Sequence, residues 1–506
     1  MKKFSKKLVW YRLIVNIVIS FIVGSFAFSS FMPEEGEPNP ETIKLALIFF
    51  VISFIVSYII FSIYQVLYYK TSGYELKEKE IVCVRGVLFK KKSILEYVKI
   101  HAVNSKQNII EKIFGISTLQ VDSGSTNTAH TAEIQIIEDE NIVNALMKII
   151  KAKQNNEEVC LTNNDTNQED KEINDSIKNI YKFDSKRKVI YSALQVAWLI
   201  VGGLFSLIIG LFAMIALVIL KEMDLPLLLI VLGGALVIIL ILSIIGFIFG
   251  LIGSLLTYYD FKLIRNKNDI EVSYGLITKI NNTFKFNKIK AVRITQSLIQ
   301  KLFGFATIKV EVIGYTMQSN EENKGYTTGI LVPLCKKSEV NSILNNLLPD
   351  YIPLEKEVKS KYYFPFVSYH LLFSFISFIL AQVVLSIFLI YYNFINELLV
   401  SSFILWTLYI VYILIILLER KLAQINSGLN VDNDKLCIYR GSIVLETIVM
   451  RKNNIIGIDE KTTHYREKKN IYTYKIHFKS NSSTNTVTVL NVDKPQSEDI
   501  YKLLKY

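Results

Sequence analysis

Six long uncharged stretches restrict the fold of this sequence more than any other feature. Each exceeds the roughly 18–20 apolar residues that cross a hydrocarbon layer about 30 Å thick. They occur in three pairs, at 8–31 and 43–69, 189–220 and 225–256, and 364–390 and 398–418. A buried helix of a water-soluble protein can be equally apolar, but six of this length indicate membrane-spanning helices. The sequence therefore predicts three transmembrane hairpins, at 8–69, 189–257 and 362–418.

Lysine and arginine are distributed unequally between the two ends of the predicted helices. The N-terminal MKKFSKK and the stretch SKRK at 185–188 are basic, whereas the loop at 32–42 holds four Glu and neither Lys nor Arg. Cytoplasmic loops are enriched in Lys and Arg. We therefore expect a bacterial cell-membrane protein whose termini and long polar segments are cytoplasmic. The first apolar stretch is too long for a cleavable signal peptide.

One segment of the sequence is present twice. IEKIFGISTLQV at 110–121 matches IQKLFGFATIKV at 299–310, which lies 189 positions later. Between 96–122 and 285–311, 11 of 27 positions are identical without a gap. The same alignment pairs KIHAV with KIKAV and Gly86 with Gly275. Each match follows a helix pair, so the sequence predicts a repeated unit of hairpin plus polar domain.

A third, weaker copy follows the last helix pair. Gly441 corresponds to Gly275, RKNNIIGI corresponds to FNKIKAVRI, and IYTYKIHF corresponds to FATIKVEV. The Phe-Gly pair of the first two copies is replaced by Lys469 and Asn470. We therefore expect a degenerate third domain.

Each polar segment has the pattern of a small β-domain. Short β-branched runs with a turn at Gly86 or Gly275 predict strands, and an amphipathic closing segment such as DENIVNALMKII predicts a C-terminal helix. Phe114 and Phe303 are expected to fill a core, while Gly115 and Gly304 allow a turn. The predicted domains are 70–152, 258–350 and 419–506, with a flexible acidic linker at 153–185.

The repeated motifs resemble those of a known family. Helix pairs followed by RGxLFKKKS, KIxAV and IxKxFGxxTxxV look like the bacterial pleckstrin-homology-like membrane proteins of the YdbS/YdbT type, and the three-unit layout is similar to the larger, YdbT-like member. The resemblance implies a pleckstrin-homology (PH)-like fold for each cytoplasmic domain. It also implies a smaller YdbS-like membrane protein as partner and, in some members, protection against membrane-active bacteriocins. It brings no catalytic residues and no cofactor.

Signatures of catalysis and metal binding are absent from the sequence. HExxH, GxGxxG, Walker A and GxSxG motifs do not occur. VDSGS at 121–125 contains the Asp-Ser-Gly of aspartic proteases, but the matching stretch of the second repeat, VEVIG, has no partner carboxylate motif. The four cysteines are isolated. A GxxxG at Gly246 and Gly250 is a candidate helix-packing face. We expect no enzyme, no cofactor and no metal.

Positive charge is the remaining signal of function. The formal net charge is +12, and the densest cluster, RGVLFKKKS, contains Arg85, Lys90, Lys91 and Lys92. Such residues beneath an anionic leaflet bind lipid headgroups, by about 1 kcal/mol for each well-placed cation. A solvated hairpin tip, or the general enrichment of cytoplasmic segments in Lys and Arg, accounts for the same residues. Nucleic acid is a poor partner, because no stacking platform or groove-reading helix is recognisable.

Two functions remain from the sequence. The first is a membrane scaffold that protects the envelope against pore-forming peptides. The second is a lipid-sensing regulatory subunit of a transporter or secretion complex. A carrier is disfavoured, because the predicted helices of the second hairpin contain no ionisable residue.

Overall fold

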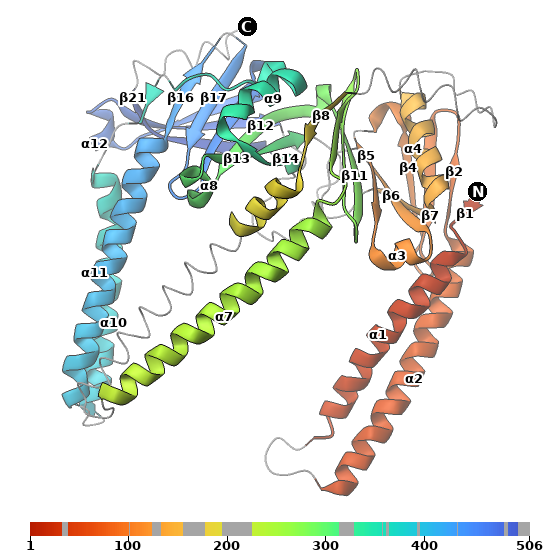
Figure 1. The fold of residues 1–506 in the computed structure, drawn as a ribbon, viewed down its shortest axis with the longest axis horizontal. Helices are drawn as coiled ribbons and strands as arrows, with labels where there is room; N and C mark the ends of the chain where they lie inside the picture. Colours follow the sequence, from red (N-terminus) through yellow and green to blue (C-terminus); the bar gives the residue numbers. More distant parts are fainter. Residues whose placement is uncertain are drawn as a thin grey trace. The chain divides into compact units, whose positions relative to one another are not determined.

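The computed structural model describes residues 1–32, 39–100, 102–123, 133–154, 178–194, 225–312, 328–356, 358–360, 364–391, 395–432, 434–479 and 484–493. The chain divides into two compact units, and Figure 1 labels their elements. Unit 1 comprises 1–178, 260–288 and 313–327, and unit 2 comprises 179–259, 289–312 and 328–506. The second repeat supplies strands to both units.

Unit 1 begins with two long apolar helices, α1 (Lys7–Ser29) and α2 (Pro40–Thr71). Arg12 on α1 donates from Nη1 to Oε1 of Gln65 on α2 at 2.8 Å. Farther along, the rings of Phe21 and Phe50 meet edge to face, 5.5 Å apart between centroids. The two helices therefore pack against each other.

A two-sheet β-domain follows α2 in unit 1. The first sheet has the order β1-β2-β3-β4, with strands Lys2–Lys3, Gly73–Leu76, Glu80–Arg85 and Lys91–Glu96. The short helix η1 (Tyr97–Lys99) leads into β5 (Ala102–Gln107), α3 (Ile109–Ile113), β6 (Ile116–Asp122), β7 (Ile134–Asp139) and α4 (Glu140–Gln154). Side chains of both sheets and of α4 form one core, including Ile81, Leu95, Leu119, Ile136 and Leu146. This is the two-sheet domain with a C-terminal helix that the sequence predicts.

The first strands of the second repeat extend a sheet of the first repeat. In unit 1, β9 (Lys262–Arg265), β10 (Asp269–Tyr274) and β11 (Lys279–Lys285) form an antiparallel meander that ends at η2 (Phe286–Lys288). β11 pairs with β5 in the register Lys279↔Gln107, which gives the order β7-β6-β5-β11-β10-β9. Neither the strand pattern nor the repeat alignment predicts this pairing between repeats.

Unit 2 contains the rest of the second repeat and the third repeat. Its elements are β8 (Lys178–Lys182), α7 (Leu225–Thr257), β12 (Ile289–Gln296), α8 (Leu298–Leu302), β13 (Phe305–Val312), β14 (Thr328–Lys336), η3 (Lys337–Glu339), α9 (Val340–Leu347), η4 (Pro349–Tyr351), β15 (Val358–Lys359), α10 (Phe364–Tyr391), α11 (Ile395–Asn426), β16 (Gly428–Val431), β17 (Lys435–Arg440), β18 (Leu445–Arg451), η5 (Lys452–Asn454), β19 (Ile455–Lys461), α12 (His464–Glu467), β20 (Ile471–Lys479) and β21 (Thr484–Asp493). One sheet has the order β14-β13-β12-β18-β17-β16-β15, and the other β19-β20-β21. Here too a strand of one repeat, β12, pairs with a strand of the next, β18.

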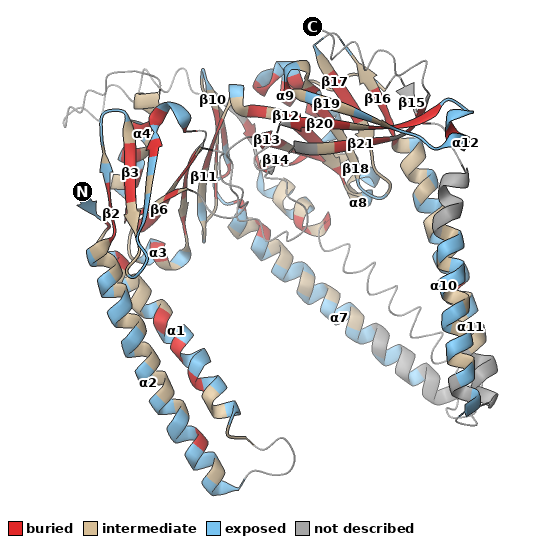
Figure 2. Ribbon diagram, turned by 180° about the vertical axis from the view of Figure 1, so that it is seen from behind, coloured by how far each residue is buried: buried red, intermediate tan, exposed pale blue. Residues whose placement is uncertain are grey.

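The long apolar helices expose apolar surface along their length. Within the described residues, α1, α2 and the part of α7 at 237–257 are long and apolar enough to span a membrane, and 371–387 within α10 is a shorter apolar helix. Figure 2 shows that buried residues gather on the strands, whereas these helices are mainly exposed or half-buried. An apolar helix surface without protein cover suits a lipid environment. Most of the predicted span at 189–220 lies outside the described residues.

Regular structure extends into both ends of the predicted linker at 153–185. The helix α4 continues to Gln154, and β8 lies at Lys178–Lys182, both within the predicted linker 153–185. Tyr181 of β8 is buried, and Arg187 donates to its hydroxyl oxygen at 2.9 Å. The predicted linker is therefore wrong for residues 178–182, because an aromatic residue anchors them. Residues 155–177 lie outside the described residues.

Candidate membrane-facing surface

The turn between β3 and β4 is fixed to the domain end of α2. Thr71 Oγ1 donates to the carbonyl oxygen of Gly86 at 2.7 Å, and the Gly86 N–H donates to Ser72 Oγ at 3.3 Å. Gly86 has φ +114°, and a Cβ there would lie 2.0 Å from the carbonyl oxygen of Phe89. Gly275 and Gly441 adopt the same conformation, with φ +113° and +119°. The sequence prediction of a glycine turn in each repeat is confirmed.

Two large apolar side chains project from this turn. Leu88 is 84% exposed and Phe89 is 93% exposed. They precede Lys90, Lys91 and Lys92, which are also exposed. The exposed apolar pair and the lysines lie next to the end of a long apolar helix. Apolar side chains favour the interior side of a lipid interface, and lysines are attracted to anionic headgroups.

Arg85 differs from the three lysines. Its guanidinium donates to Oε1 of Gln135 at 3.2 Å and to the carbonyl oxygen of Glu133 at 3.0 Å. These contacts direct Arg85 across the domain toward β7. The structure therefore places the predicted cluster in two environments, with only the lysines on the exposed turn and strand.

The short helix α3 contributes a second exposed apolar group. A capping box of Asn108 and Glu111 starts the helix, and burial raises the pKa of the Glu111 carboxyl. Ile113 at its end is 76% exposed. Figure 1 shows α3 beside the domain ends of α1 and α2. Lys112 donates to the carbonyl oxygen of Leu276 at 3.2 Å, so α3 also contacts the β10–β11 turn.

Unit 2 repeats this arrangement. Leu302, the last residue of α8, is 80% exposed, and Phe303, which follows it, is 63% exposed. The register Gln296↔Leu445 brings α8 to the same sheet end as the β17–β18 turn, where Val444 is exposed. Ser442 of that turn donates to Oε1 of Glu419 on α11 at 3.3 Å. Short helix and hairpin turn thus form adjacent apolar projections here as in unit 1.

The prediction that Phe303 is a core residue is wrong. Phe303 directly follows α8 and is exposed, and its equivalent Phe114 is only half-buried. The following glycines are correctly predicted turn residues, since Gly115 and Gly304 have φ +64° and +70°. In a water-soluble domain, an apolar residue before a turn glycine is usually buried in the core. Close to a membrane, the same residue can be exposed because it can contact lipid.

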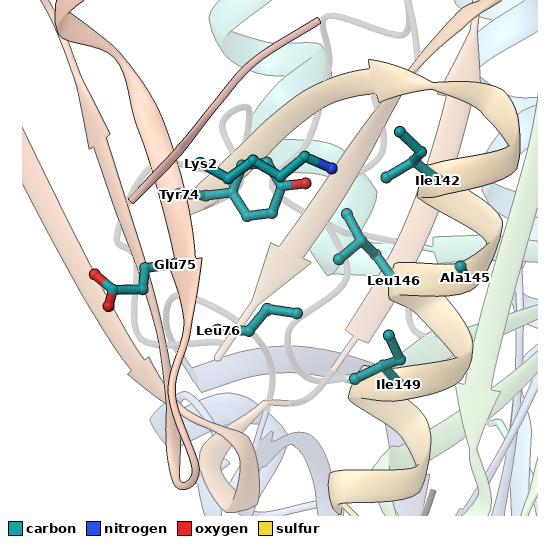
Figure 3. Close-up of a pocket in the computed structure, with 8 residues that line it drawn as sticks. All are labelled: Lys2, Tyr74, Glu75, Leu76, Ile142, Ala145, Leu146 and Ile149. Atoms are coloured by element: carbon teal, nitrogen blue, oxygen red, sulfur yellow. The ribbon is translucent and has the colours of Figure 1, made fainter. Parts of the chain in front are cut away.

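An apolar cavity of unit 1 lies away from this surface. A cavity of about 360 Å³ opens between β2 and α4, lined by Lys2, Tyr74, Glu75, Leu76, Ile142, Ala145, Leu146 and Ile149 (Figure 3). The Tyr74 hydroxyl donates to Oε1 of Glu138 at 3.2 Å, and burial raises the pKa of Tyr74. Such a hydroxyl is a poor proton donor or acceptor near neutral pH.

Reactive and metal-binding groups do not gather among the described residues. No group of three or more His, Cys, Asp or Glu side chains there could hold a metal ion. Cys83, Cys335 and Cys437 are buried, and burial raises the pKa of Cys335 to about 12. This thiol is protonated and unreactive. Gly246 and Gly250 lie half-buried in α7.

Comparison with known proteins agrees with this architecture. The family model of the bacterial PH domain matches residues 18–154 and 196–350, more than half of the chain. The chain belongs to the bacterial PH domain family. Transmembrane protein YdbT of Bacillus subtilis (strain 168) is 23% identical over 456 residues, which cover 86% of this chain and 85% of the relative. The predicted relationship to YdbT-type membrane proteins is confirmed, and the two family matches end before the third repeat.

Proposed function

We propose that this protein is a non-enzymatic multi-pass scaffold that holds three PH-like domains against the anionic inner leaflet and thereby reduces damage by membrane-active bacteriocins. The proposal rests on one observation. In each unit, exposed apolar residues lie at the end of the domain whose turn is hydrogen-bonded to a long apolar helix. In unit 1 they stand next to Lys90, Lys91 and Lys92. Apolar side chains enter the headgroup region, and lysines neutralise lipid phosphates above them.

The proposal includes six membrane spans in three hairpins, with both termini in the cytoplasm. Its support is the Lys and Arg asymmetry of the sequence and the attachment of the lysine-bearing turn to α2. A cysteine placed at Asn39 should react with an impermeant maleimide on intact cells. One placed at Lys91 should react only after permeabilisation, and the opposite result contradicts this topology.

The lipid contact is tested by neutralising the three lysines in the full-length protein. We expect Lys90→Gln/Lys91→Gln/Lys92→Gln to increase killing by cationic bacteriocins, since anionic lipid is no longer held. The matched control neutralises Lys77, Lys79 and Lys153. Lys77 and Lys79 lie in or beside the β2–β3 turn, at the other end of β3, and Lys153 donates to the Lys77 carbonyl oxygen. Equal killing of expressing and null strains across several bacteriocins would reject the protective function and favour a lipid-sensing regulatory subunit.

A partner-based mechanism predicts a different outcome. If protection passes through a smaller YdbS-like membrane protein or a transporter, deletion of that partner abolishes protection and the lysine variants behave as the wild type. Reconstitution separates the two mechanisms. An environment-sensitive fluorophore on a cysteine at Leu88 should report an apolar surrounding in vesicles rich in phosphatidylglycerol and a wetter one in neutral vesicles. The same label at Glu75, which is exposed on β2, should not distinguish the vesicles.

A further inference from the structure

Neighbouring repeats are joined by the same pair of strand edges in both units. The first and third repeats each have one corresponding edge that is not used in this way. β11 and β18 are equivalent strands, and they pair with the equivalent strands β5 and β12. The strand of the first repeat that corresponds to β11 is β4, and the strand of the third that corresponds to β12 is β19. Within the described residues, β4 and β19 are end strands of their sheets. Among the described strands, β4 and β19 therefore each have one edge without a neighbouring strand.

The two internal pairings have the same register. Asn281 lies opposite Ser105 in unit 1, and their equivalents Thr447 and Ile294 lie opposite each other in unit 2. The corresponding residue of β4 is Lys92, 189 positions before Asn281, and that of β19 is Glu460, 166 positions after Ile294. A third pairing in this register would therefore place Lys92 opposite Glu460 and the exposed Ile94 opposite Ile458.

The two open edges have net charges of opposite sign. β4 and the residue before it carry Lys90, Lys91, Lys92 and Glu96, whereas β19 carries Asp459, Glu460 and Lys461. The stated register also places Lys461 opposite Lys91, so the attraction rests on Lys90 and Lys92 with Asp459 and Glu460 and on one diagonal contact of Lys91. In unit 2, Arg293 of β12 pairs with Glu446 of β18 at 2.6 Å. Asp459 corresponds to Arg293, and Lys91 corresponds to Glu446. In the proposed pairing these two residues would therefore form a diagonal ion pair in which the acidic and basic residues have exchanged strands. Lysine-rich β4 edges repel one another, which disfavours a symmetric pairing of two β4 strands.

We propose that β19 of one copy of this protein pairs antiparallel with β4 of a second copy. The second copy is the occupant because its edge has a net charge of opposite sign and continues a pairing that the chain already makes twice. Such a contact joins two different surfaces, so repetition gives rings or rows of copies. Anchoring in one membrane restricts both copies to a shared layer and raises the effective concentration of the edges. This proposal does not depend on lipid binding or on bacteriocin protection.

Cysteine cross-linking in proteoliposomes that contain only this protein tests the contact. The full-length chain carries Lys92→Cys and Glu460→Cys, with its native cysteines replaced by alanine. Mild oxidation should give dimers and larger species on a non-reducing gel. The control Glu75→Cys/Glu460→Cys uses an exposed residue of the interior strand β2 and should stay monomeric apart from collisional products. Equal cross-linking of the two variants, or none for Lys92→Cys/Glu460→Cys although both cysteines accept a maleimide, would overturn the proposal.

Reciprocal charge reversal separates pairing between copies from closure within one copy. Lys92→Glu and Glu460→Lys each place like charges opposite one another. Each should lower recovery of an untagged copy with a tagged copy of the same variant, by about 2-fold to 5-fold for an exposed pair. Mixing tagged Lys92→Glu with untagged Glu460→Lys restores opposite charges and should restore recovery. A failure of the mixture to recover overturns the proposal, as does a cross-linked product that migrates as a compact monomer. Cross-linking in cells to a different protein, with none between copies, would assign the edge to another partner.

Discussion

The β5–β11 junction of unit 1 and the β12–β18 junction of unit 2 have one backbone register and different side-chain chemistry. In unit 1 the side-chain contacts between the two strands are neutral, with the Thr283 N–H donating to Asn104 Oδ1 at 3.3 Å and Asn281 Nδ2 donating to Ser105 Oγ at 3.2 Å. An ion pair of this junction is more exposed and lies beside the strands, where Lys279 of β11 contacts Glu140 of α4 at 3.0 Å. In unit 2 the position of Asn104 is taken by Arg293, whose side chain is 4% exposed.

Arg293 lies within a buried group of charges. It pairs with Glu311 and Glu446, and Glu446 also accepts from Arg440 at 2.6 Å. Burial opposes ionisation of Glu446, but Arg293 and Arg440 outweigh it and hold the pKa of this carboxyl below its usual range. The comparison shows that the two junctions share one backbone register although their side-chain contacts differ. Ion pairs contribute more to the selection of a partner than to stability.

The largest difference between the junctions is expected on removal of Arg293. Arg293→Met leaves Glu311 and Glu446 buried without their shared cation, and should lower the local opening free energy by about 3–5 kcal/mol. Asn104→Leu in unit 1 removes a neutral hydrogen bond and should cost on the order of 1 kcal/mol. Hydrogen exchange of β12, β18, β5 and β11 in the full-length protein measures both.

A matched variant checks the cause of the Arg293 effect. Arg293→Met combined with Glu311→Leu and Glu446→Leu removes the uncompensated charges, and should recover most of the lost protection from exchange. If the triple variant exchanges as fast as Arg293→Met, loss of packing rather than of charge balance explains the effect.

Substitution of the turn glycine should have the same effect on stability at both junctions. Gly275 precedes β11 and Gly441 precedes β18, and a Cβ at either would lie 1.9 Å from a carbonyl oxygen. Gly275→Ala and Gly441→Ala should therefore each destabilise the adjacent strand pair by about 1–3 kcal/mol. Gly457→Ala is the control, because a Cβ there meets no atom within 4 Å. Unequal effects in hydrogen exchange of β11 and β18 would show that the two turns are not equivalent.

The smallest effect is expected at the turn that differs in the third repeat. Asn470 has φ +54°, close to the values of Gly115 and Gly304. Asparagine tolerates this left-handed conformation better than alanine does, so Asn470→Ala should cost about 1 kcal/mol and Asn470→Gly almost nothing. Thermal unfolding of the full-length variants measures the difference. Equal melting temperatures for the two variants would contradict this role of the side chain.

The repeat was predictable because local backbone requirements recur in the sequence. Thr118 and Glu111 are hydrogen-bonded in the first repeat, Thr307 and Gln300 in the second, and Thr473 and Arg466 in the third. The partner of the threonine differs each time, although the threonine recurs. Sequence alignment therefore recognises the threonine and not the contact that it makes, which weakened the match of the third repeat.

The candidate surface was only partly predictable. The lysine cluster at 90–92 is visible in the sequence, and its neighbours Leu88 and Phe89 read as ordinary strand residues before the turn is known. Nothing in the sequence indicated that Phe303 is exposed, because an apolar residue at the end of a short helix can be either buried in a core or exposed. A glycine turn with two apolar residues in each repeat was the available clue.

The sequence by itself determined the apolar helices, the repeated β-domain and the glycine turns, because hydropathy, strand periodicity and positive φ depend on neighbouring residues. Only the tertiary structure decided which strand of one repeat pairs with the next, and that Arg293 contacts Glu446, 153 positions away. The physical reason is that a strand edge offers the same N–H and C=O groups whatever its side chains. Its partner is therefore selected by the folded arrangement and by a few charges whose proximity the linear sequence does not express.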